Sequence, residues 1–205
     1  MSLFRQAAFF TSAVSLNGLP QADGGEIVFA GRSNAGKSSA INALTRRRSL
    51  AYVAKRPGRT QQINFFSLGE NRYLVDLPGY GYAKVPEALR KSWQILISEY
   101  FLTRYSLLGL VFIIDARHPL TPLDWQMLDW FKPTEKPVLI LLSKSDKLTK
   151  QEARRTLSEV NHLLAKFHPH CSAQLFSSTK KIGVEEAEGT LALWFKESAN
   201  HKTRK

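Results

Sequence analysis

The sequence predicts a three-layer α/β fold in which a mainly parallel, six-stranded sheet lies between two layers of helices. Short apolar runs alternate with longer helical patterns along the chain, and this alternation is typical of parallel strands that are connected by helices. The link between two of the runs, residues 69–72, is as short as a hairpin loop. One strand is therefore expected to run antiparallel to the others.

Each expected strand is a short apolar run of the kind that is buried inside a sheet. In chain order, the expected strands are residues 27–30, 63–68, 73–75, 109–115, 138–142 and 174–176. The segments between them mostly carry the apolar spacing of amphipathic helices. The expected helices are residues 38–44, 86–105, 122–131, 150–167 and 184–195.

An N-terminal arm precedes this core. Residues 1–25 end in the turn signal Asp23-Gly24-Gly25, and we expect Phe4, Phe9 and Phe10 to pin the arm to the sheet. A chain of 205 residues is long enough to bury one independent core. The expected division is an arm over residues 1–25, one domain over residues 26–196 and a basic tail over residues 197–205.

A glycine-rich run joins the first expected strand to the first expected helix. It reads Gly31-Arg32-Ser33-Asn34-Ala35-Gly36-Lys37-Ser38 and fits the pattern G-x-x-x-x-G-K-[S/T] at every fixed position. Glycines at both ends let the backbone curl until successive N–H groups point into one cavity, where a polyphosphate can lie. We expect Lys37 to reach the β and γ phosphates and Ser38 to offer its hydroxyl to Mg²⁺, with Ser39 beside them at the anion-favouring end of the helix. An ordinary glycine-rich turn is the alternative, but the strand–loop–helix context favours a nucleoside triphosphate site.

A second motif lies at the end of an apolar strand. The run Asp76-Leu77-Pro78-Gly79 carries the D-x-x-G signature of nucleotide switches. Asp76 would hold Mg²⁺ through water, and the amide of Gly79 would meet the γ-phosphate. This segment can therefore distinguish a triphosphate from a diphosphate, and Leu77 and Pro78 are included in the predicted site.

A second Mg²⁺ hydroxyl is expected between the first helix and the next strand. Thr60, in the run Arg56-Pro57-Gly58-Arg59-Thr60, is the best candidate, and Gly58 and Arg59 are expected to contact the nucleotide beside it. A turn threonine after Pro-Gly is the alternative role. Thr45 is less suitable because it lies at the end of the helix that begins in the phosphate loop. The predicted catalytic residues are Lys37, Thr60 and Gly79.

The choice of base depends on the run Ser143-Lys144-Ser145-Asp146, a variant of the guanine-reading pattern N-K-x-D. The carboxylate of Asp146 can accept hydrogen bonds from N1–H and the exocyclic amine of guanine together, whereas adenine offers no such donor pair on that edge. GTP is therefore favoured over ATP. We expect Lys144 to pack over the base and brace the phosphate loop, and we expect modest base affinity because Ser143 lacks the amide that usually ties the two together.

A further predicted contact to the base lies after the last expected strand. The run Ser177-Ser178-Thr179-Lys180 resembles the S-A-K loop whose backbone amide meets guanine O6. A surface Ser/Thr turn is the alternative.

This ordered set of motifs resembles the translation-factor class of P-loop GTPases, in the group of TrmE, Era, EngA and EngB, and within it the EngB (YihA/YsxC) family. The most distinctive element is Pro78-Gly79-Tyr80-Gly81-Tyr82-Ala83, which general GTPase chemistry does not require. The resemblance implies a single-domain, Ras-like bacterial GTPase that acts in the cytoplasm in assembly of the large ribosomal subunit, with ribosomal RNA or protein as partner. It also implies a role in growth, cell division and septation.

The residue after D-x-x-G is Tyr80, where many GTPases carry a glutamine that orients the attacking water. We therefore expect slow intrinsic hydrolysis that a partner or a cation accelerates. Asn34 resembles the asparagine of potassium-activated GTPases and is the candidate K⁺ ligand, with a turn residue as the alternative. The glycines beside Tyr80 and Tyr82 predict mobility and contact of both tyrosines with a partner.

The chain is strongly basic, with a formal net charge of +12. No acidic residue occurs from residue 27 to residue 69, a stretch that holds Arg46, Arg47 and Arg48. Phosphate backbones are the natural partner of such a surface, although a solvated basic face is the alternative. The preference for RNA comes from the family resemblance alone.

Other features favour a monomeric protein of a reducing compartment. The single cysteine, Cys171, is expected to be a small buried hydrophobe that forms no disulfide within the chain. We expect neither a signal peptide nor a membrane span, because no apolar run is long enough. The histidines are not spaced as a metal cluster, and the tryptophans are expected to pack in or at the edge of the core. Asp115 resembles the strand-end acid that neighbours a base site, but capping of the next element is the preferred role.

Two other classes of function remain open from the sequence. One is a basic RNA-binding module whose nucleotide site only stabilises the fold. The other is a P-loop kinase or ATPase of another branch, which Asp146 argues against.

Overall fold

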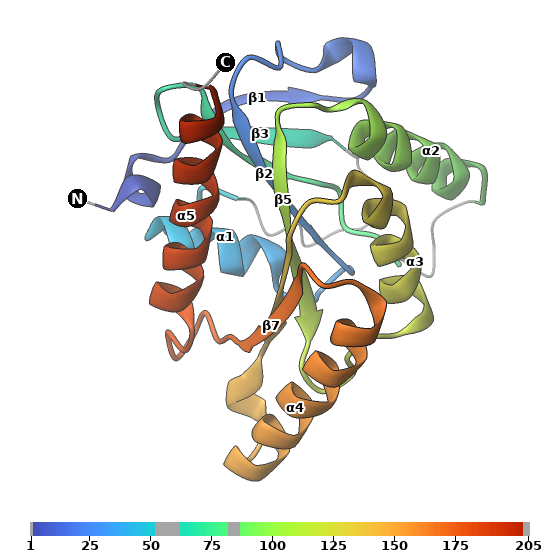
Figure 1. Ribbon diagram of the computed structural model, residues 1–205, viewed down its shortest axis with the longest axis vertical. Coiled ribbons are helices and arrows are strands. Elements are labelled where there is room, and N and C mark those ends of the chain that lie inside the picture. Colours follow the sequence, from blue (N-terminus) through green and yellow to red (C-terminus); the bar gives the residue numbers. More distant parts are fainter. Residues whose placement is uncertain (1, 52–61, 82–86, 203–205) are drawn as a thin grey trace.

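The computed structural model describes residues 2–51, 62–81 and 87–202 (Figure 1). Within these residues the centre of the molecule is one seven-stranded sheet with the strand order β1-β3-β4-β2-β5-β6-β7. The strands are β1 (Ala8–Ala13), β2 (Gly25–Gly31), β3 (Ile63–Ser67), β4 (Arg72–Asp76), β5 (Leu107–Asp115), β6 (Val138–Ser143) and β7 (Cys171–Leu175).

The sheet is mainly parallel, as the sequence predicts. Strands β4, β2, β5, β6 and β7 pair in parallel, whereas β3 runs antiparallel to both of its neighbours, β4 and β1. The fold class is therefore confirmed, but the expected number of six strands is wrong because the N-terminal arm adds a seventh. Strand β1 was missed because its apolar start, Ala8 to Phe10, is followed by the polar Thr11 and Ser12, so that the strand is not one continuous apolar run.

The helices cover both faces of the sheet (Figure 1). Helices α1 and α5 lie on one face, and α2, α3 and α4 lie on the other. The helices are α1 (Lys37–Thr45), α2 (Glu87–Thr103), α3 (Pro122–Phe131), α4 (Lys150–Phe167) and α5 (Val184–Lys202). Short 3₁₀ turns are η1 (Leu3–Gln6), η2 (Leu16–Gly18), η3 (Lys132–Thr134) and η4 (Ser145–Lys147).

Alternating side chains of the central strands fill two separate cores. In β2, Val28 and Ala30 belong to the core beneath α2, α3 and α4, while Ile27 and Phe29 belong to the core beneath α1 and α5. Successive side chains of a strand point to opposite faces, so a strand covered on both sides is apolar throughout. All four of these side chains are at most 1% exposed, which explains the continuous apolar runs in the sequence.

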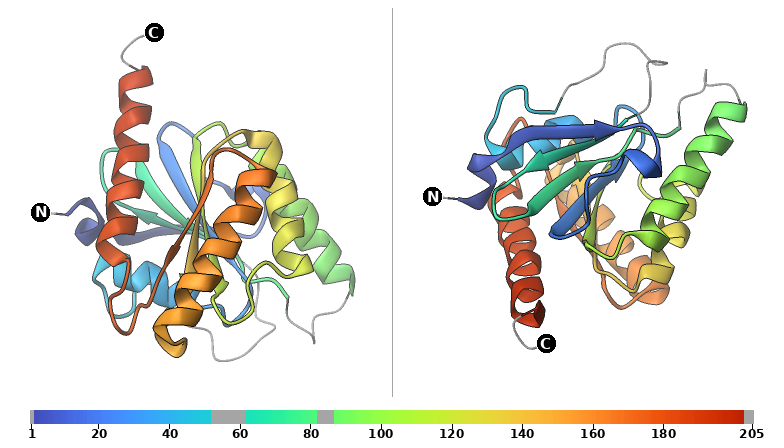
Figure 2. Two further views of the ribbon diagram at one scale, coloured as in Figure 1. Left: turned by 60° about the horizontal axis from the view of Figure 1, so that its bottom comes forward. Right: turned by 90° about the horizontal axis from the view of Figure 1, so that it is seen from above.

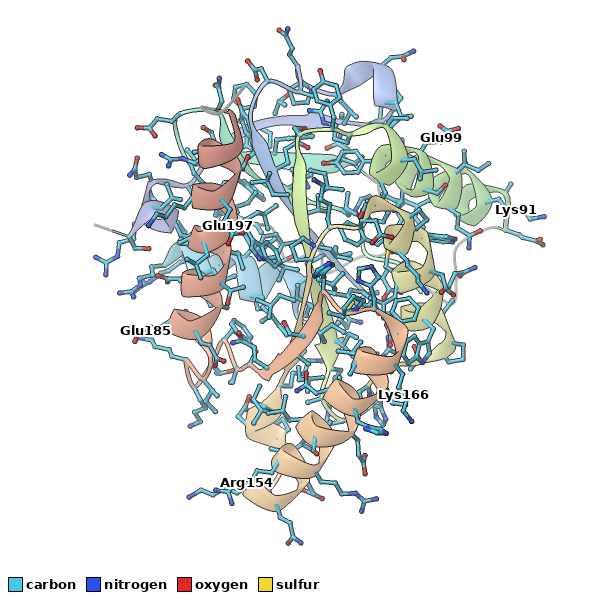
Figure 3. All side chains as sticks on the ribbon, viewed as in Figure 1. Lys91, Glu99, Arg154, Lys166, Glu185 and Glu197 are labelled. Carbon is cyan, nitrogen blue, oxygen red and sulfur yellow. The ribbon has the colours of Figure 1, made fainter. Side chains whose placement is uncertain are left out.

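The helices begin where their capping residues predict. In α3, Thr121 and Asp124 form a capping box ahead of Pro122, and in α4 Thr149 and Glu152 form another. These side chains satisfy N–H groups that the first turn of a helix leaves without partners. Charged side chains such as those of Lys91, Arg154 and Glu185 project outward from the helices, away from the sheet (Figure 3).

The two ends of the chain compare differently with the expectations. Phe4 is buried, and the rings of Phe9 and Phe10 contact Phe66 of β3 and Tyr73 of β4, so all three pin the arm to the sheet as expected, although Phe9 and Phe10 remain 60% and 51% exposed. Helix α5 continues to Lys202, beyond its expected end at residue 195, and its last turns extend past the sheet (Figure 2). The expected end was the last residue of the apolar pattern. The residues that follow still allow a helix, so the helix continues past it.

Candidate nucleotide-binding site

The carboxyl ends of the parallel strands bring the sequence motifs to one edge of the sheet. The phosphate loop follows β2, Asp76 ends β4, Ser143 ends β6 and Ser177 follows β7. Ligands of open α/β sheets bind at this edge, because the loops after parallel strands all meet there. Segments that are more than a hundred residues apart in the chain, such as Asn34 and Lys144, are in contact as a result.

The two glycines that frame the phosphate loop are needed for different reasons. Gly36 has a φ of 103°, which side-chain-bearing residues rarely adopt. At Gly31, a Cβ atom would lie 2.7 Å from the carbonyl oxygen of Ile113 in β5, so only glycine allows this close approach. Asn34 also adopts a left-handed conformation, with a φ of 63°, as expected of a turn residue.

Helix α1 begins directly after the loop, at Lys37. Ser38 and Ser39 lie in its first turn, at the end of the helix whose dipole favours an anion. Thr45 lies at the end of α1 and donates its hydroxyl hydrogen to the carbonyl oxygen of Ile41, which supports leaving it out of the predicted Mg²⁺ site.

Lys37 and Asp76 face each other across the site. The Nζ atom of Lys37 donates to Oδ1 of Asp76, and the two side chains are 10% and 9% exposed. Asp76 is held beside the loop because Leu77 donates its N–H to the carbonyl oxygen of Phe29 in β2 at 3.0 Å. The oxygen donors of Asp76 and Ser38 are of the type that Mg²⁺ prefers, so this end of the site fits that ion.

The rest of the D-x-x-G segment lies on the phosphate loop. Ser33 donates its N–H to the carbonyl oxygen of Tyr80 at 2.7 Å. A Cβ atom on Gly79 would lie only 3.5 Å from the Cα atom of Ser33. Gly79 is therefore adjacent to the first half of the loop, and Pro78 precedes it as a buried residue.

Two side chains of the guanine motif hold the phosphate loop. Ser143 donates its hydroxyl hydrogen to the carbonyl oxygen of Ala35, and Lys144 donates to the carbonyl oxygen of Asn34 at 2.6 Å. The bracing role predicted for Lys144 is therefore confirmed. The hydroxyl of Ser143 links the guanine motif to the loop, as the missing amide would have done, and the modest base affinity stays a prediction.

Asp146 is oriented by the loop after β7. Ser177 donates its hydroxyl hydrogen to Oδ1 of Asp146 at 2.6 Å, and this hydrogen bond is the main cause that lowers the pKa of Asp146. Ser145 in turn bonds the carbonyl oxygen of Phe176 at 2.9 Å. The run from Ser177 to Lys180 is therefore joined to the guanine motif and is more than a surface turn, with Ser178 half-buried and Thr179 exposed.

Asp115 does not cap the following helix, which Thr121 begins instead. Its carboxylate accepts hydrogen bonds from Arg117 Nε at 2.9 Å, Arg117 Nη2 at 2.7 Å and Lys144 Nζ at 3.0 Å. Burial raises the pKa of Asp115, but the hydrogen bonds from Arg117 and Lys144 outweigh it and lower the pKa below its usual range. The sequence signal for this role was the position of Asp115 at the end of a strand beside the base site.

Tyr80 is a buried residue, and the prediction that it contacts a partner is wrong. It is 6% exposed, stacks on Trp93 and Phe112, and donates its phenol hydrogen to Oδ1 of Asp124 at 2.8 Å. The flanking glycines predicted mobility, but the aromatic ring is large enough to anchor the segment in the core. Asp124 was missed as a neighbour of the site, because in the sequence it is simply an acidic residue in the first turn of the helix that Thr121 caps.

Four of the predicted residues fall outside the part of the chain that the structure describes. They are Gly58, Arg59, Thr60 and Tyr82. His168 caps the end of α4. Trp93 is buried, and Trp125, Trp130 and Trp194 pack partly buried against the two cores, as expected. Among the residues that the structure describes, there is no group of three or more His, Cys, Asp or Glu side chains that could hold a metal. The Cys171 thiol is partly buried, and burial raises its pKa to about 11.

Comparison with known proteins adds the family. Residues 26–144, more than half of the chain, match the family described as 50S ribosome-binding GTPase. A protein of Nitrosomonas europaea named probable GTP-binding protein EngB is 58% identical over 94% of this chain and 87% of its own length. The chain belongs to the EngB family of GTP-binding proteins. A second EngB relative, of Methylobacillus flagellatus, is also 58% identical and covers 95% of this chain and 94% of its own length.

Solved structures agree with the EngB fold. A crystal structure of a probable EngB protein has a TM-score of 0.65 at 22% identity and covers 84% of this chain and 99% of its own. A structure of Era in complex with MgGDPNP and a segment of 16S ribosomal RNA has a TM-score of 0.62 at 22% identity, covering 83% of this chain and 56% of its own. As an EngB protein the chain is a P-loop GTPase, which hydrolyses GTP. In the described part of the chain, none of the helices has the length and apolar character to span a bilayer.

Proposed function

We propose that this EngB protein is a nucleotide-dependent switch that binds Mg²⁺·GTP, hydrolyses it slowly and docks in its GTP form on the large ribosomal subunit during assembly in the bacterial cytoplasm. Loss of this activity would impair growth, cell division and septation. The proposal includes a monomeric protein and the domain division given by the sequence, with an arm, a GTPase domain and a basic tail.

The observation that carries the switch is the convergence of Lys37, Asp76 and Gly79 at one edge of the sheet. Lys37 and Asp76 form an ion pair, and Gly79 lies against the phosphate loop. A γ-phosphate with its Mg²⁺ would engage all three, because the lysine and the amide bind phosphate oxygens and the carboxylate binds the ion. A diphosphate would leave Gly79 without this contact. The conformation of this segment would therefore differ between the GTP-bound and the GDP-bound protein.

The proposed ligands extend this arrangement. The phosphates would be held by residues 31–39 together with Gly58 and Arg59, and the guanine base by residues 143–146 and 177–179. Mg²⁺ would be held by Ser38, Thr60 and, through water, Asp76. Two of these ligands, Ser38 in the helix after β2 and Asp76 at the end of β4, lie at the same end of two neighbouring strands, which supports a shared ion.

Slow hydrolysis is supported by the position of the Tyr80 side chain. Its phenol donates to Asp124 inside the core, so at this position there is no side chain that orients the attacking water. A K⁺ ion at Asn34, which is exposed and lies in the phosphate loop, is proposed to compensate. Turnover measured in KCl and NaCl tests this part: higher turnover in KCl supports the ion, and equal turnover excludes it.

The ribosomal partner is supported by charge and by the family. Arg47 and Arg48 are exposed directly after α1, whereas Arg46 is partly neutralised by Glu188 of α5 at 3.6 Å. A basic surface of this kind attracts RNA phosphates in a salt-dependent manner. The family description names binding to the 50S ribosome, and the Era structure contains ribosomal RNA.

Co-sedimentation with purified large subunits tests the proposal. The protein is mixed with subunits in GDP, GTP or a non-hydrolysable GTP analogue across a salt series. We expect the analogue to give the strongest binding, with Arg47→Ala and Arg48→Ala weakening it and reducing its salt dependence. The matched control is Arg154→Ala with Lys166→Ala on exposed positions of α4. Binding that is the same with every nucleotide and is lost at high salt would instead indicate a basic RNA-binding module with a structural nucleotide site.

A further inference from the structure

We propose that Asp124 is a positioning residue for nucleotide discrimination: it ties Tyr80 and Arg32 to helix α3 and thereby holds Gly79 ready for the γ-phosphate. The inference rests on the nucleotide-switch part of the proposed function and is independent of the ribosomal partner. It assigns a role to a buried carboxylate that contributes nothing to the predicted nucleotide ligands.

Asp124 is completely buried and both of its oxygens are engaged. Oδ1 accepts hydrogen bonds from the Tyr80 phenol at 2.8 Å and from Arg32 Nε at 3.2 Å. Oδ2 accepts from the N–H and the hydroxyl of Thr121, each at 2.8 Å. A carboxylate at 0% exposure is stable only when donors satisfy it in this way, so the four contacts define its position closely.

The donors to Asp124 come from three separate parts of the chain. Arg32 belongs to the phosphate loop, Tyr80 follows the D-x-x-G motif, and Thr121 caps α3. Arg32 also donates through Nη2 to the carbonyl oxygen of His118 at 2.9 Å, in the loop before α3. Asp124 and its neighbours therefore fasten both phosphate-sensing segments to one rigid helix.

The backbone continues this connection to Gly79. Tyr80 accepts the N–H of Ser33 at 2.7 Å and pairs with Arg32 as an isolated parallel bridge. With Tyr80 fixed on one side and Asp76 at the end of β4 on the other, the intervening Gly79 has little freedom. Because its conformation is already restricted, contact with a γ-phosphate costs less conformational entropy. A diphosphate makes no such contact and gains nothing from the restriction.

The Tyr80 phenol remains a hydrogen-bond donor at neutral pH. Burial, together with the nearby Asp124 carboxylate, raises the pKa of Tyr80 well above its usual value. The phenol therefore stays protonated and able to donate to Asp124 at neutral pH.

Equilibrium titration with fluorescent GDP and a fluorescent non-hydrolysable GTP analogue, at constant Mg²⁺, tests the proposal. Tyr80→Phe removes the hydrogen bond but keeps the ring in its stack on Trp93 and Phe112. We expect the affinity for the analogue to fall about fivefold to tenfold, the effect of one buried hydrogen bond, while the affinity for GDP changes less than about twofold. Asp124→Asn removes the charge that pairs with Arg32 and should shift the ratio of affinities in the same direction.

Tyr100→Phe is the matched control. The Tyr100 phenol donates to another buried carboxylate, Glu26, at 2.5 Å, at the opposite end of β2 from the phosphate loop. Its loss should leave the ratio of the two affinities unchanged. The proposal is overturned if Tyr80→Phe lowers both affinities equally, favours the triphosphate, or matches Tyr100→Phe. A wild-type protein that binds both nucleotides equally would instead overturn the switch itself.

Discussion

Lys144 donates a hydrogen bond of 2.6 Å to the carbonyl oxygen of Asn34, so the segment proposed to read the base also holds the phosphate loop. The same ammonium group lies 3.0 Å from Oδ2 of Asp115 at the end of β5. Segments at the ends of three adjacent strands, β2, β5 and β6, therefore meet at the Nζ atom of Lys144. If these segments bind the base and the phosphates as proposed, the two binding functions are physically linked, and the first predictions below test this link.

Lys144→Met should lower the affinity for GDP by about tenfold or more. The substitution keeps most of the apolar stem but removes a charged donor, and hydrogen bonds to charged groups contribute about 1.5–3 kcal/mol. Fluorescent-nucleotide titration measures the change. Lys150→Met, at an exposed position at the start of α4, is the control and should bind GDP like the wild type. A wild-type affinity for Lys144→Met would show that Ser143 alone holds the loop.

Asp146→Asn should change the base that the site prefers. Xanthine carries a carbonyl group where guanine carries its exocyclic amine, so it requires a donor where guanine requires an acceptor. We expect GDP affinity to fall at least about 100-fold, since two charge-assisted hydrogen bonds are lost, and affinity for xanthosine diphosphate to rise. Competition titrations with the two nucleotides measure this.

The control for this exchange is Asp129→Asn on an exposed position of α3, which should leave the preference for guanine unchanged. If Asp146→Asn loses GDP without gaining the xanthine nucleotide, the residue supports the loop and does not read the base.

Asp115→Asn should make the protein less stable at neutral pH and should flatten its response to acid. The pKa of Asp115 is lowered in the folded protein, so the ionised carboxylate stabilises the fold above its unfolded pKa of about 3.9, and this contribution is lost as the pH falls through the folded value. The free energy of unfolding of the wild type should exceed that of Asp115→Asn by a constant amount from about pH 5 to pH 8, and the difference should shrink below about pH 4.

Urea denaturation at several pH values measures this difference. Because Asp115 holds Lys144, the variant should also bind GDP more weakly at neutral pH. A difference in stability that grows on acidification would contradict the assignment.

Arg104→Met should destabilise the protein without weakening nucleotide binding. The guanidinium of Arg104 and the carboxylate of Glu26 are paired at 2.6 Å with side chains 9% and 1% exposed. Removing one partner of a buried pair costs about 3–5 kcal/mol, which lowers the Tm of a chain of this size by roughly 6–20 °C. Thermal denaturation measures the change.

An exposed pair provides the comparison. Arg155 and Glu159 lie one turn apart on α4, with side chains 79% and 59% exposed. Arg155→Met should cost less than about 1 kcal/mol, because solvent screens surface pairs. Equal effects of the two substitutions would mean that the Glu26 cluster contributes no more than a surface pair.

Much of the fold could be predicted because its central strands are buried on both faces. Strands β2, β5 and β6 fall near their expected positions, since a strand buried along its whole length must be mainly apolar. Strands β3, β4 and β7 are less completely buried, and the edge strand β7 begins before its expected start at residue 174. The edge strand β1 could not be predicted in this way. Its exposed Phe9 and Phe10 depart from a buried run, and its pairing with β3 shifts register between Phe9 and Thr11.

The part of the candidate site that lies in motifs of fixed spacing could be predicted from the sequence. Lys37 begins α1, Asp76 ends β4 and Asp146 lies in the short turn η4 after β6, where such motifs require them. The link from Ser143 to Ala35 could not be predicted from residue type, because it depends on how closely β6 approaches the loop. Tyr80 was misjudged because glycine neighbours describe backbone freedom and do not describe the core beside it.

The sequence alone predicts the order of the helices and of strands β2 to β7 along the chain, the phosphate-binding loop and the chemical groups available to a nucleotide, because these depend on local periodicity and on spacing along the chain. Only the tertiary structure decided which distant groups meet: Lys144 with Asn34, Tyr80 with Asp124, and the N-terminal arm with β3. Such contacts depend on how helices and strands pack against one another and on which buried polar groups need partners. Neither can be predicted from the pattern of a single segment of the chain.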